Sequence, residues 1–338
     1  MKNRKIYLIV FTMFISILTR CVFGRNPLVD RPMGDPSAYV FECKLFMYGK
    51  QDRLCRKNPN DTSWTCFSTT DMKNWTNHKD IFSLDDIPWA EGYAFAPDAE
   101  YKNGKYYLYV PVSASSERWE WRTAIGTSSN PEGPFTYHDY INVPEYDPMV
   151  FTDDTGQSYI YYPGRMAKLK DGMASIESEW KFRKDYLIGG PLNDEKYHTY
   201  ENPFVFKRKD KYYYLLSIFH NTEQGITKGQ YVHYWIGDSP MGPFRYEDVL
   251  FAAEDGHTDG GNIGSSVVQY KGYWLFFYHE PFYTPERGCT ERKPCLDIIH
   301  FNDQGLIKLD ISDTNQSFDL KDFGLIPQFE KSNNSDNL

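Results

Sequence analysis

Residues 104–110, GKYYLYV, follow the turn dipeptide Asn103-Gly104 and form an aromatic-rich run of the kind that favours a β-strand. Related runs recur along the chain at intervals of roughly 50 to 60 residues, a period typical of repeats arranged around an axis. The other four runs are residues 44–49 (KLFMYG), 156–162 (GQSYIYY), 211–217 (KYYYLLS) and 272–279 (GYWLFFYH). The repeat therefore predicts blades around a common axis and not a sandwich with a single core.

A second repeated element supports the blades. Residues 125–138 (IGTSSNPEGPFTYH) and 236–247 (IGDSPMGPFRYE) nearly superimpose, and residues 66–78 (CFSTTDMKNWTNH) are a looser copy. Each is expected to form an outer hairpin, and two hairpins per repeat make a four-stranded blade. No long stretch has apolar residues at helical spacing, so the fold class is predicted to be all-β, a five-bladed β-propeller.

The chain has 338 residues, of which 41% are hydrophobic and 17% aromatic, enough for one large domain. Most of the aromatic side chains are expected to pack between strands. Residues 1–24 read as a signal peptide, because a basic start precedes an apolar run of about 13 residues, shorter than the about 20 that span a bilayer. We expect a catalytic propeller over residues 25–331 and a disordered polar tail over residues 332–338.

The formal net charge is −9, and loss of the four basic residues of the signal peptide takes it to −13. An acidic secreted protein is a poor partner for nucleic acid or for an anionic membrane, and it suits a neutral substrate. Cys21, at the end of the leader, would suit a bacterial lipoprotein signal, but the residues before it are not small.

Cysteines that remain after cleavage are odd in number, so at least one is free or intermolecular. Cys289 and Cys295 would close a short loop, and two of Cys43, Cys55 and Cys66 would pin the first blade. No Cys-x-x-Cys spacing indicates a zinc site.

Acidic residues precede the aromatic runs in four repeats: Asp35, Asp98, Asp147 and Glu201. Residues just before a strand near the propeller axis line one mouth of the channel, so these carboxyls should converge there. Converging acids raise one another's pKa, so that one stays protonated while another is ionised, the pairing that glycoside hydrolysis needs. The alternative is that each acid only caps a turn, since Asp-Pro and Asn-Pro favour turns.

The ordered motifs in residues 26–41, 95–111, 146–162, 201–217, 264–280 and 295–307 resemble those of glycoside hydrolase family 43. The resemblance covers nearly the whole mature chain, from Asn26 to about Asp310. It implies a five-bladed propeller and an inverting enzyme that acts on plant polysaccharides containing xylose and arabinose.

The resemblance implies that Asp35 is the general base, Glu201 the general acid and Asp147 the residue that tunes the pKa of the acid. An inverting mechanism needs base and acid about 6.5 to 9.5 Å apart, so that a water molecule fits between them. Arg292 matches an arginine that reaches into the sugar pocket of similar enzymes, and the alternative for it is a surface arginine in a charged loop. Phe95 and Asp98 are implied to contact the substrate.

Two positions depart from the family pattern. Phe95 stands where a tryptophan is usual, which keeps a stacking surface but makes it smaller. Gly264 stands where many relatives have a histidine that helps to hold an axial calcium ion, and glycine cannot ligate through a side chain. We therefore predict no metal and no cofactor.

Together these features predict a secreted exo-acting β-xylosidase that releases xylose from β-1,4-xylo-oligosaccharides or xylan. One alternative is an α-L-arabinofuranosidase of the same family. Another is a propeller that binds carbohydrate without catalysis, and a third is a retaining propeller hydrolase of fructans, which would need carboxyls about 5 to 5.5 Å apart.

Overall fold

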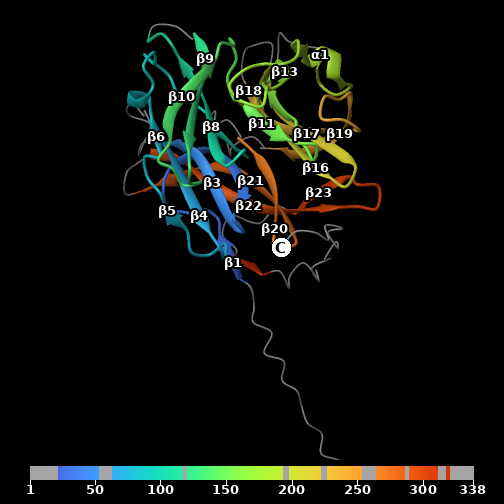
Figure 1. Ribbon diagram of the computed structural model, residues 1–338. Helices are drawn as coiled ribbons and strands as arrows, with labels where there is room; N and C mark the ends of the chain where they lie inside the picture. The colour runs from blue at the N-terminus through green and yellow to red at the C-terminus, as the bar shows by residue number, and fades with distance from the viewer. Residues whose placement is uncertain are drawn as a thin grey trace, which may run out of the picture.

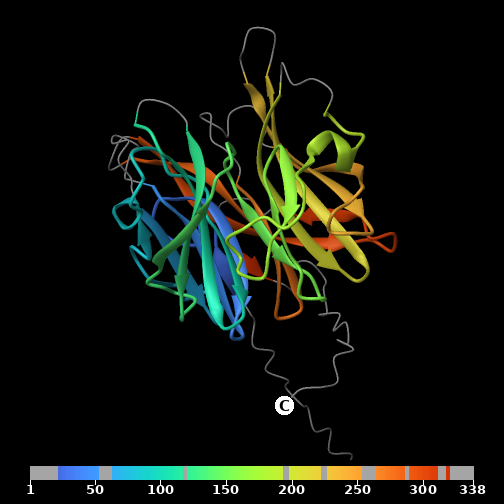
Figure 2. The ribbon, with the colours of Figure 1, turned by 45° about the horizontal axis from the view of Figure 1, so that its top comes forward.

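The computed structural model describes residues 22–52, 63–116, 120–192, 198–221, 227–252, 264–285, 289–310 and 317–319. These residues form five β-sheets arranged around an axis, as Figures 1 and 2 show, and neighbouring strands within them are antiparallel except for one parallel pair in the fourth sheet. The predicted five-bladed β-propeller is confirmed. Most of the predicted signal peptide, residues 1–21, and the predicted tail, residues 332–338, lie outside the described residues.

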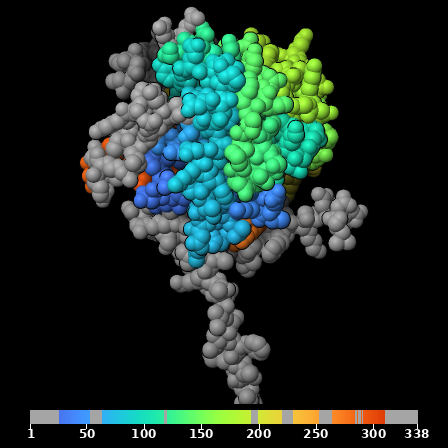
Figure 3. All heavy atoms as spheres, turned by 60° about the vertical axis from the view of Figure 1, so that its left-hand side comes forward, coloured from blue at the N-terminus to red at the C-terminus, as the bar shows by residue number. Residues whose placement is uncertain are grey.

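Each blade is one continuous segment of chain, numbered here in chain order. Blade I contains β2 (Met33–Phe41), β3 (Lys44–Gln51), β4 (Ser63–Thr69), β5 (Thr76–Asn77) and β6 (Phe82–Ser83). A short 3₁₀ helix, η2 (Leu84–Asp86), follows it. Blade II contains β7 (Asp98–Lys102), β8 (Lys105–Ser113), β9 (Trp121–Ser128) and β10 (Thr136–Ile141). Figure 3 shows the flank on which these two blades lie side by side.

The remaining blades repeat the plan with small additions. Blade III contains β11 (Met149–Thr152), β12 (Ser158–Tyr161), β13 (Arg165–Lys168) and β14 (Lys181–Phe182). The short helix α1 (Arg183–Tyr186) leads to blade IV, which contains β15 (Leu187–Ile188), β16 (His198–Arg208), β17 (Lys211–Asn221), β18 (Thr227–Gly237) and β19 (Phe244–Ala252). Blade V contains β20 (Ser266–Tyr270), β21 (Tyr273–Thr284), β22 (Cys289–Phe301) and β23 (Ile307–Asp310).

The ring closes through the innermost strand of each blade. In order around the axis, β2 contacts β7, β7 contacts β11, β11 contacts β16, β16 contacts β20, and β20 returns to β2. The aromatic runs are the second strands, β3, β8, β12, β17 and β21, and the innermost strands carry the acids. The sequence analysis placed the acids before the strand nearest the axis. Three of them in fact lie within such strands, and Asp147 lies just before β11.

The two ends of the described chain meet outside the blades. Strand β1 (Val22–Arg25) pairs with β24 (Ser317–Asp319) in a separate two-stranded sheet. Residues 22–24 of this strand belong to the segment that the sequence analysis assigned to the signal peptide.

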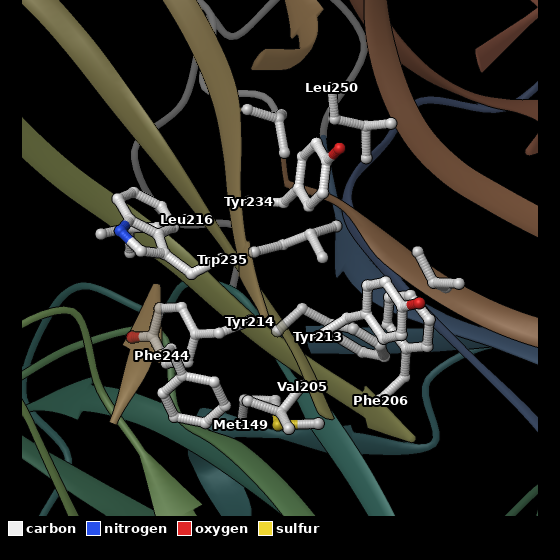
Figure 4. Packing of buried hydrophobic residues seen from close by; sticks show 14 of the residues in the cluster. Met149, Val205, Phe206, Tyr213, Tyr214, Leu216, Tyr234, Trp235, Phe244 and Leu250 are labelled. Carbon is white, nitrogen blue, oxygen red and sulfur yellow. The ribbon is translucent and has the colours of Figure 1, made fainter. Parts of the chain in front are cut away.

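The hydrophobic core lies between the blades, because each sheet is covered on both faces by its neighbours. Separate clusters of buried side chains fill the space between blades I and II, between II and III, and between V and I. The largest cluster joins blades III, IV and V, and Figure 4 shows part of it around Tyr214, Trp235 and Phe244. Most of the largest fully buried side chains are tyrosines, so strand packing accounts for much of the aromatic content, as expected.

A buried tyrosine joins each blade to the next. Its hydroxyl donates a hydrogen bond to a backbone carbonyl in the outer hairpin of the following blade, and the ring is 5% exposed or less. The pairs around the ring are Tyr48 to Pro131 (2.6 Å), Tyr109 to Met173 (2.8 Å), Tyr161 to Pro240 (2.8 Å), Tyr213 to Gly305 (2.8 Å) and Tyr270 to Thr70 (3.0 Å). Each repeat therefore contributes a hydrogen bond to the next blade in addition to the strands of its own blade.

The predicted disulfides are wrong. Cys43, Cys66 and Cys295 are free, whereas Cys289 is disulfide-bonded to a cysteine outside the described residues. Neither a Cys289–Cys295 bridge nor any bridge within the first-blade set is therefore formed, and Cys289 and Cys295 lie six residues apart on one extended strand, farther apart than a disulfide can span. Cys66 and Cys295 are fully buried in the interblade cores, where they pack as small apolar side chains.

Candidate active site

Four acids from four blades meet at the axis. Asp35 lies in β2, Asp98 begins β7, Asp147 lies two residues before β11, and Glu201 lies in β16. Because these strands are the innermost of their blades, side chains at this end of each strand face one another. A cavity of about 20 Å³ at the axis is lined by Asp35, Asp98, Asp147, Asn202 and Ser265, among others. This volume is about that of one water molecule.

The backbone bends at the same point in three blades. Asp35, Asp147 and Asn202 each precede a proline and have positive φ angles of 55°, 50° and 47°. Asp and Asn adopt this left-handed conformation more readily than most residues, and bulges of this type re-aim a side chain. The strand registers shift beside Asp35 and Asn202, as a bulge requires. Asp35 and Asp147 therefore share one register, whereas Glu201 lies one residue earlier in its own repeat.

Asp35 is 5% exposed and contacts two side chains of blade V, one an acceptor and one a donor. Its backbone N–H donates to Nδ1 of His279 at 3.0 Å, and Nη1 of Arg292 donates to its carboxylate oxygens at 3.2 and 3.3 Å. Gly264 is packed so closely that a Cβ there would lie 2.6 Å from the Cα of Asp35. Because Gly264 has no side chain, blade V can approach Asp35 closely.

Arg292 is a buried residue of β22, so the alternative of a surface arginine in a charged loop is wrong. Besides Asp35, its guanidinium donates to both oxygens of Asp52, from Nε at 2.6 Å and from Nη2 at 2.8 Å. Its approach requires Gly34, because a Cβ there would lie 2.0 Å from Nη2. The sequence analysis missed Asp52, which has no motif of its own and directly follows β3.

Among the residues that the structure describes, no cation lies at hydrogen-bonding distance from Asp147 or Glu201. Asp147 accepts the backbone N–H of Asn202 at 3.1 Å, and Glu201 accepts Nε2 of the buried Gln230 at 3.4 Å. Burial, and then the negative charge of Asp35, raise the pKa of Asp147 to about 8. Burial, and then the charges of Asp147 and Asp35, raise the pKa of Glu201 well above its ordinary value. The charge of Asp35 therefore acts on both Asp147 and Glu201, and the charge of Asp147 acts on Glu201.

The pKa of Asp35 is also raised by burial, but the nearby positive charge of Arg292 opposes the rise most strongly, and Lys50 adds to that effect. Asp35 is thus the carboxyl of the three that the surroundings favour most in its ionised form. An ionised carboxylate opposite a protonated carboxylic acid is the arrangement that an acid–base pair needs.

Asp98 joins three blades. Its Oδ1 accepts the hydroxyls of Ser37 at 2.5 Å and Tyr39 at 2.6 Å, and its Oδ2 accepts the backbone N–H of Val150 at 2.6 Å. It is 2% exposed, and burial raises its pKa to about 7. These contacts indicate a structural role at the axis, and the predicted contact of Asp98 with substrate stays a prediction.

Three aromatic rings lie next to one another beside the acids. Phe95 packs on Trp121, with ring centroids 5.2 Å apart, and Trp121 packs on Tyr146 at 6.1 Å. Tyr146 precedes Asp147, and its pKa is raised by burial and then by the charge of Glu201. Lys50 lies over the other end of the row, 5.1 Å from the Phe95 ring. The sequence analysis found Phe95 but missed Trp121 and Tyr146, which only the fold brings together.

A second hollow of about 510 Å³ lies between blades III and IV. Its lining combines apolar and basic side chains, among them Leu187, Leu192, Arg165 and Arg183. The guanidinium of Arg183 stacks on Tyr200 at 3.5 Å, and Tyr200 precedes Glu201. This hollow shares no lining residue with the axial cavity.

The residues of the axial cavity do not fit a directly bound calcium ion. Asp98 already accepts three donors from the chain, and Gly264 has neither a side-chain ligand nor room for one. Within the described ranges, no three His, Cys, Asp or Glu side chains are grouped to hold a metal. No step below involves a metal.

A five-bladed propeller with paired buried carboxyls at its axis defines a propeller-type glycosidase. The model of glycosyl hydrolases family 43 matches residues 24–307. The chain belongs to this family, and it is an inverting glycoside hydrolase.

Several known proteins are similar to the chain. It is 30% identical to xylosidase/arabinosidase 43A of Humicola insolens over 73% of this chain and 87% of the relative. It is 28% identical to a β-xylosidase of Xylanibacter ruminicola, over 73% and 87%. A solved β-xylosidase/α-arabinofuranosidase from a compost metagenome, in complex with xylotriose and calcium-free, is 26% identical with a TM-score of 0.68, and the match covers 85% of this chain and 97% of that one. Xylosidase/arabinofuranosidase activity is therefore the class that the relatives support.

Proposed function

We propose that the protein is a secreted exo-acting β-xylosidase that releases xylose from β-1,4-xylo-oligosaccharides or xylan. The observation that carries this proposal is the difference between Asp35, compensated by Arg292, and Glu201, surrounded by carboxyls. The relatives named as xylosidases supply the substrate class.

In the proposed mechanism, Asp35 is the general base. Its carboxylate accepts a proton from a water molecule as the water oxygen attacks the anomeric carbon. Arg292 keeps this carboxylate ionised before the reaction, and His279 holds its backbone through Nδ1. The new C–O bond forms on the face opposite to the departing sugar, so the anomeric configuration inverts.

Glu201 is the proposed general acid. Its carboxylic proton passes to the glycosidic oxygen as the bond from that oxygen to the anomeric carbon breaks. Asp147 is the proposed modulator, because ionisation of Asp147 disfavours ionisation of Glu201. Gln230 donates to Glu201 and fixes the position of the side chain. The row of Phe95, Trp121 and Tyr146 would form an apolar wall for the sugar ring.

The second candidate is α-L-arabinofuranosidase activity, which is favoured by the relatives named for both activities. The test compares hydrolysis of aryl β-xyloside and aryl α-arabinofuranoside by the wild type, Asp35→Ala and Glu201→Ala. A higher kcat/KM on the arabinofuranoside would replace the first candidate with the second. Sugar binding without hydrolysis of either substrate would contradict both and leave a binding propeller.

Two further measurements test the finer points. Product analysis with xylotetraose distinguishes exo from endo action, since an exo enzyme releases xylose from the first turnover. NMR of the first product should show the inverted anomer. A retained anomer would contradict the assigned roles of Asp35 and Glu201.

Secretion is also a proposal, supported by the basic and apolar pattern of residues 1–24. In the described part of the chain, no helix combines the length and the apolar character of a membrane span. Mass spectrometry of the protein from culture medium would test it, and an N-terminus at Met1 would contradict cleavage.

A further inference from the structure

Asp52 lies outside the set of acids at the axis, yet it is linked to one of them through a single side chain. It directly follows β3, and its side chain is 10% exposed. Both of its oxygens accept hydrogen bonds from Arg292, at 2.6 and 2.8 Å. Two parallel bonds of this kind fix the plane of a guanidinium as well as its position.

That plane decides which nitrogen reaches the base. With Nε and Nη2 bound to Asp52, only Nη1 extends to Asp35, and it does so at the longer distances of 3.2 and 3.3 Å. The plane cannot shift toward β2 freely, because the guanidinium already lies against Gly34. Asp35 thus accepts hydrogen bonds from Nη1 alone, whereas Asp52 accepts them from the edge of the guanidinium that carries Nε and Nη2.

We propose that Asp52 is a positioning residue that holds the Arg292 guanidinium so that Asp35 is neutralised only in part. This inference rests on the proposed role of Asp35 as the general base. A carboxylate gripped by a full bidentate arginine pair would be a poor proton acceptor, because the cation would stabilise its ionised form too strongly. The division of the guanidinium between two acids keeps Asp35 ionised and still basic.

The charges around Asp35 support this view. The groups that face it are His279 from β21, Arg292 from β22, Lys50 and Asp52 from the end of β3, Asp147 from the segment before β11, and Glu201 from β16. Asp52 raises the pKa of Asp35, whereas Arg292 lowers it. Loss of the Asp52 charge therefore lowers the pKa of Asp35 directly, and a released Arg292 would lower it further.

The test is Asp52→Asn, assayed on aryl β-xyloside across the acidic and neutral pH range. We expect kcat to fall by about 10- to 100-fold, the size of effect that misplacement of one group causes, with a smaller change in KM. The acidic limb of kcat/KM should move to lower pH. Asp52→Glu, which restores the charge, should return the limb toward its wild-type position.

Asp30→Asn is the matched control. Asp30 accepts a hydrogen bond from Lys293, the next residue of β22, at 2.6 Å, and its side chain is 88% exposed. Loss of this pair should leave kcat within about twofold and leave the pH profile in place, since Asp30 is exposed and its partner is Lys293 and not Arg292.

Two outcomes would overturn the proposal. One is a wild-type kcat and pH profile in Asp52→Asn. The other is a loss of activity with an unmoved acidic limb, together with a lower melting temperature, which would make Asp52 a purely structural residue. An inactive wild type, or an active Asp35→Ala variant, would instead contradict the proposed function and is recognised in the same assay.

Discussion

The two sides of the propeller axis carry the same kind of group in opposite surroundings. On the side of blades I and V, Asp35 faces Arg292, and the neutral His279 accepts its backbone N–H. On the side of blades III and IV, the charge of Asp147 acts on Glu201, and the donors to the two carboxyls within the described part of the chain are one backbone N–H and one amide.

Burial raises the pKa on both sides, so burial alone does not distinguish the base from the acid. The distinguishing feature is the guanidinium of Arg292, a cation from blade V that donates a hydrogen bond to Asp35. A glycosidase needs two carboxyls with different protonation states, and here a single arginine creates that difference.

The largest effects should come from removal of the two carboxyls. Asp35→Ala should lower kcat/KM about 10³-fold on xylobiose and on an activated aryl xyloside alike, because the attacking water needs a base in both. Glu201→Ala should lose a similar factor on xylobiose but less than about tenfold on the aryl xyloside, whose leaving group needs little protonation. Equal losses of Glu201→Ala on both substrates would contradict its assignment as the acid.

Removal of the Arg292 cation should make the electrostatic surroundings of Asp35 similar to those of Asp147 and Glu201. In Arg292→Gln the pKa of Asp35 should rise, because the strongest opposing charge is lost, so activity at acidic pH should fall by about 100-fold. The acidic limb of kcat/KM should move to higher pH, opposite to the shift expected for Asp52→Asn. A shift in the same direction for both variants would contradict the picture of a shared guanidinium.

Ionisation of Asp147, on the side of blades III and IV, should make the fold less stable as pH rises. The pKa of Asp147 in the folded protein is about 8, above its value of about 3.9 in an unfolded chain. The folded state therefore binds the proton more tightly, and the stability it gains at acidic pH is lost as pH rises through about 8. Asp147→Asn should remove this dependence and raise the free energy of unfolding at alkaline pH by on the order of 2 kcal/mol.

Denaturant unfolding of the wild type and Asp147→Asn at acidic and alkaline pH checks this expectation. Asp153→Asn is a matched control, because its pKa is lowered and its carboxyl stabilises the fold as an anion. That variant should lose stability at neutral pH. A parallel pH dependence of the wild type and Asp147→Asn would show that Asp147 is not protonated in the folded protein.

The smallest effect concerns the tyrosine bonds between blades, which lie away from both sides of the axis. Tyr161→Phe should lower the free energy of unfolding by about 1 kcal/mol, because the carbonyl of Pro240 loses its donor, and should leave kcat unchanged. Tyr109→Phe, which loses the bond to Met173, should behave in the same way. A change in the pH profile of either variant would link the blade contacts to the site.

Much of the fold was predictable because the blade is a local unit. The aromatic runs became the second strands, and residues 125–138 and 236–247 span outer hairpins as expected. The position of the acids was less accurate, since the innermost strands, which precede the aromatic runs, have a weaker pattern in the sequence. The predicted Cys289–Cys295 disulfide was wrong because both residues lie on the extended strand β22, about 20 Å apart along it, and a short loop was expected there instead.

The residues of the site also divide into those that the sequence predicts and those that only the tertiary structure brings together. The sequence alone determined which carboxyls meet, because three of the five repeats place an Asp-Pro or Glu-Asn-Pro segment at the axis. Asp52, Gln230 and Trp121 come from positions without a repeated motif, and only the tertiary structure brings them to the acids. It also decided which carboxyl has a cation, since Arg292 reaches Asp35 only when blade V closes on blade I past two glycines. Charge compensation depends on distance in space, which repeat spacing does not encode.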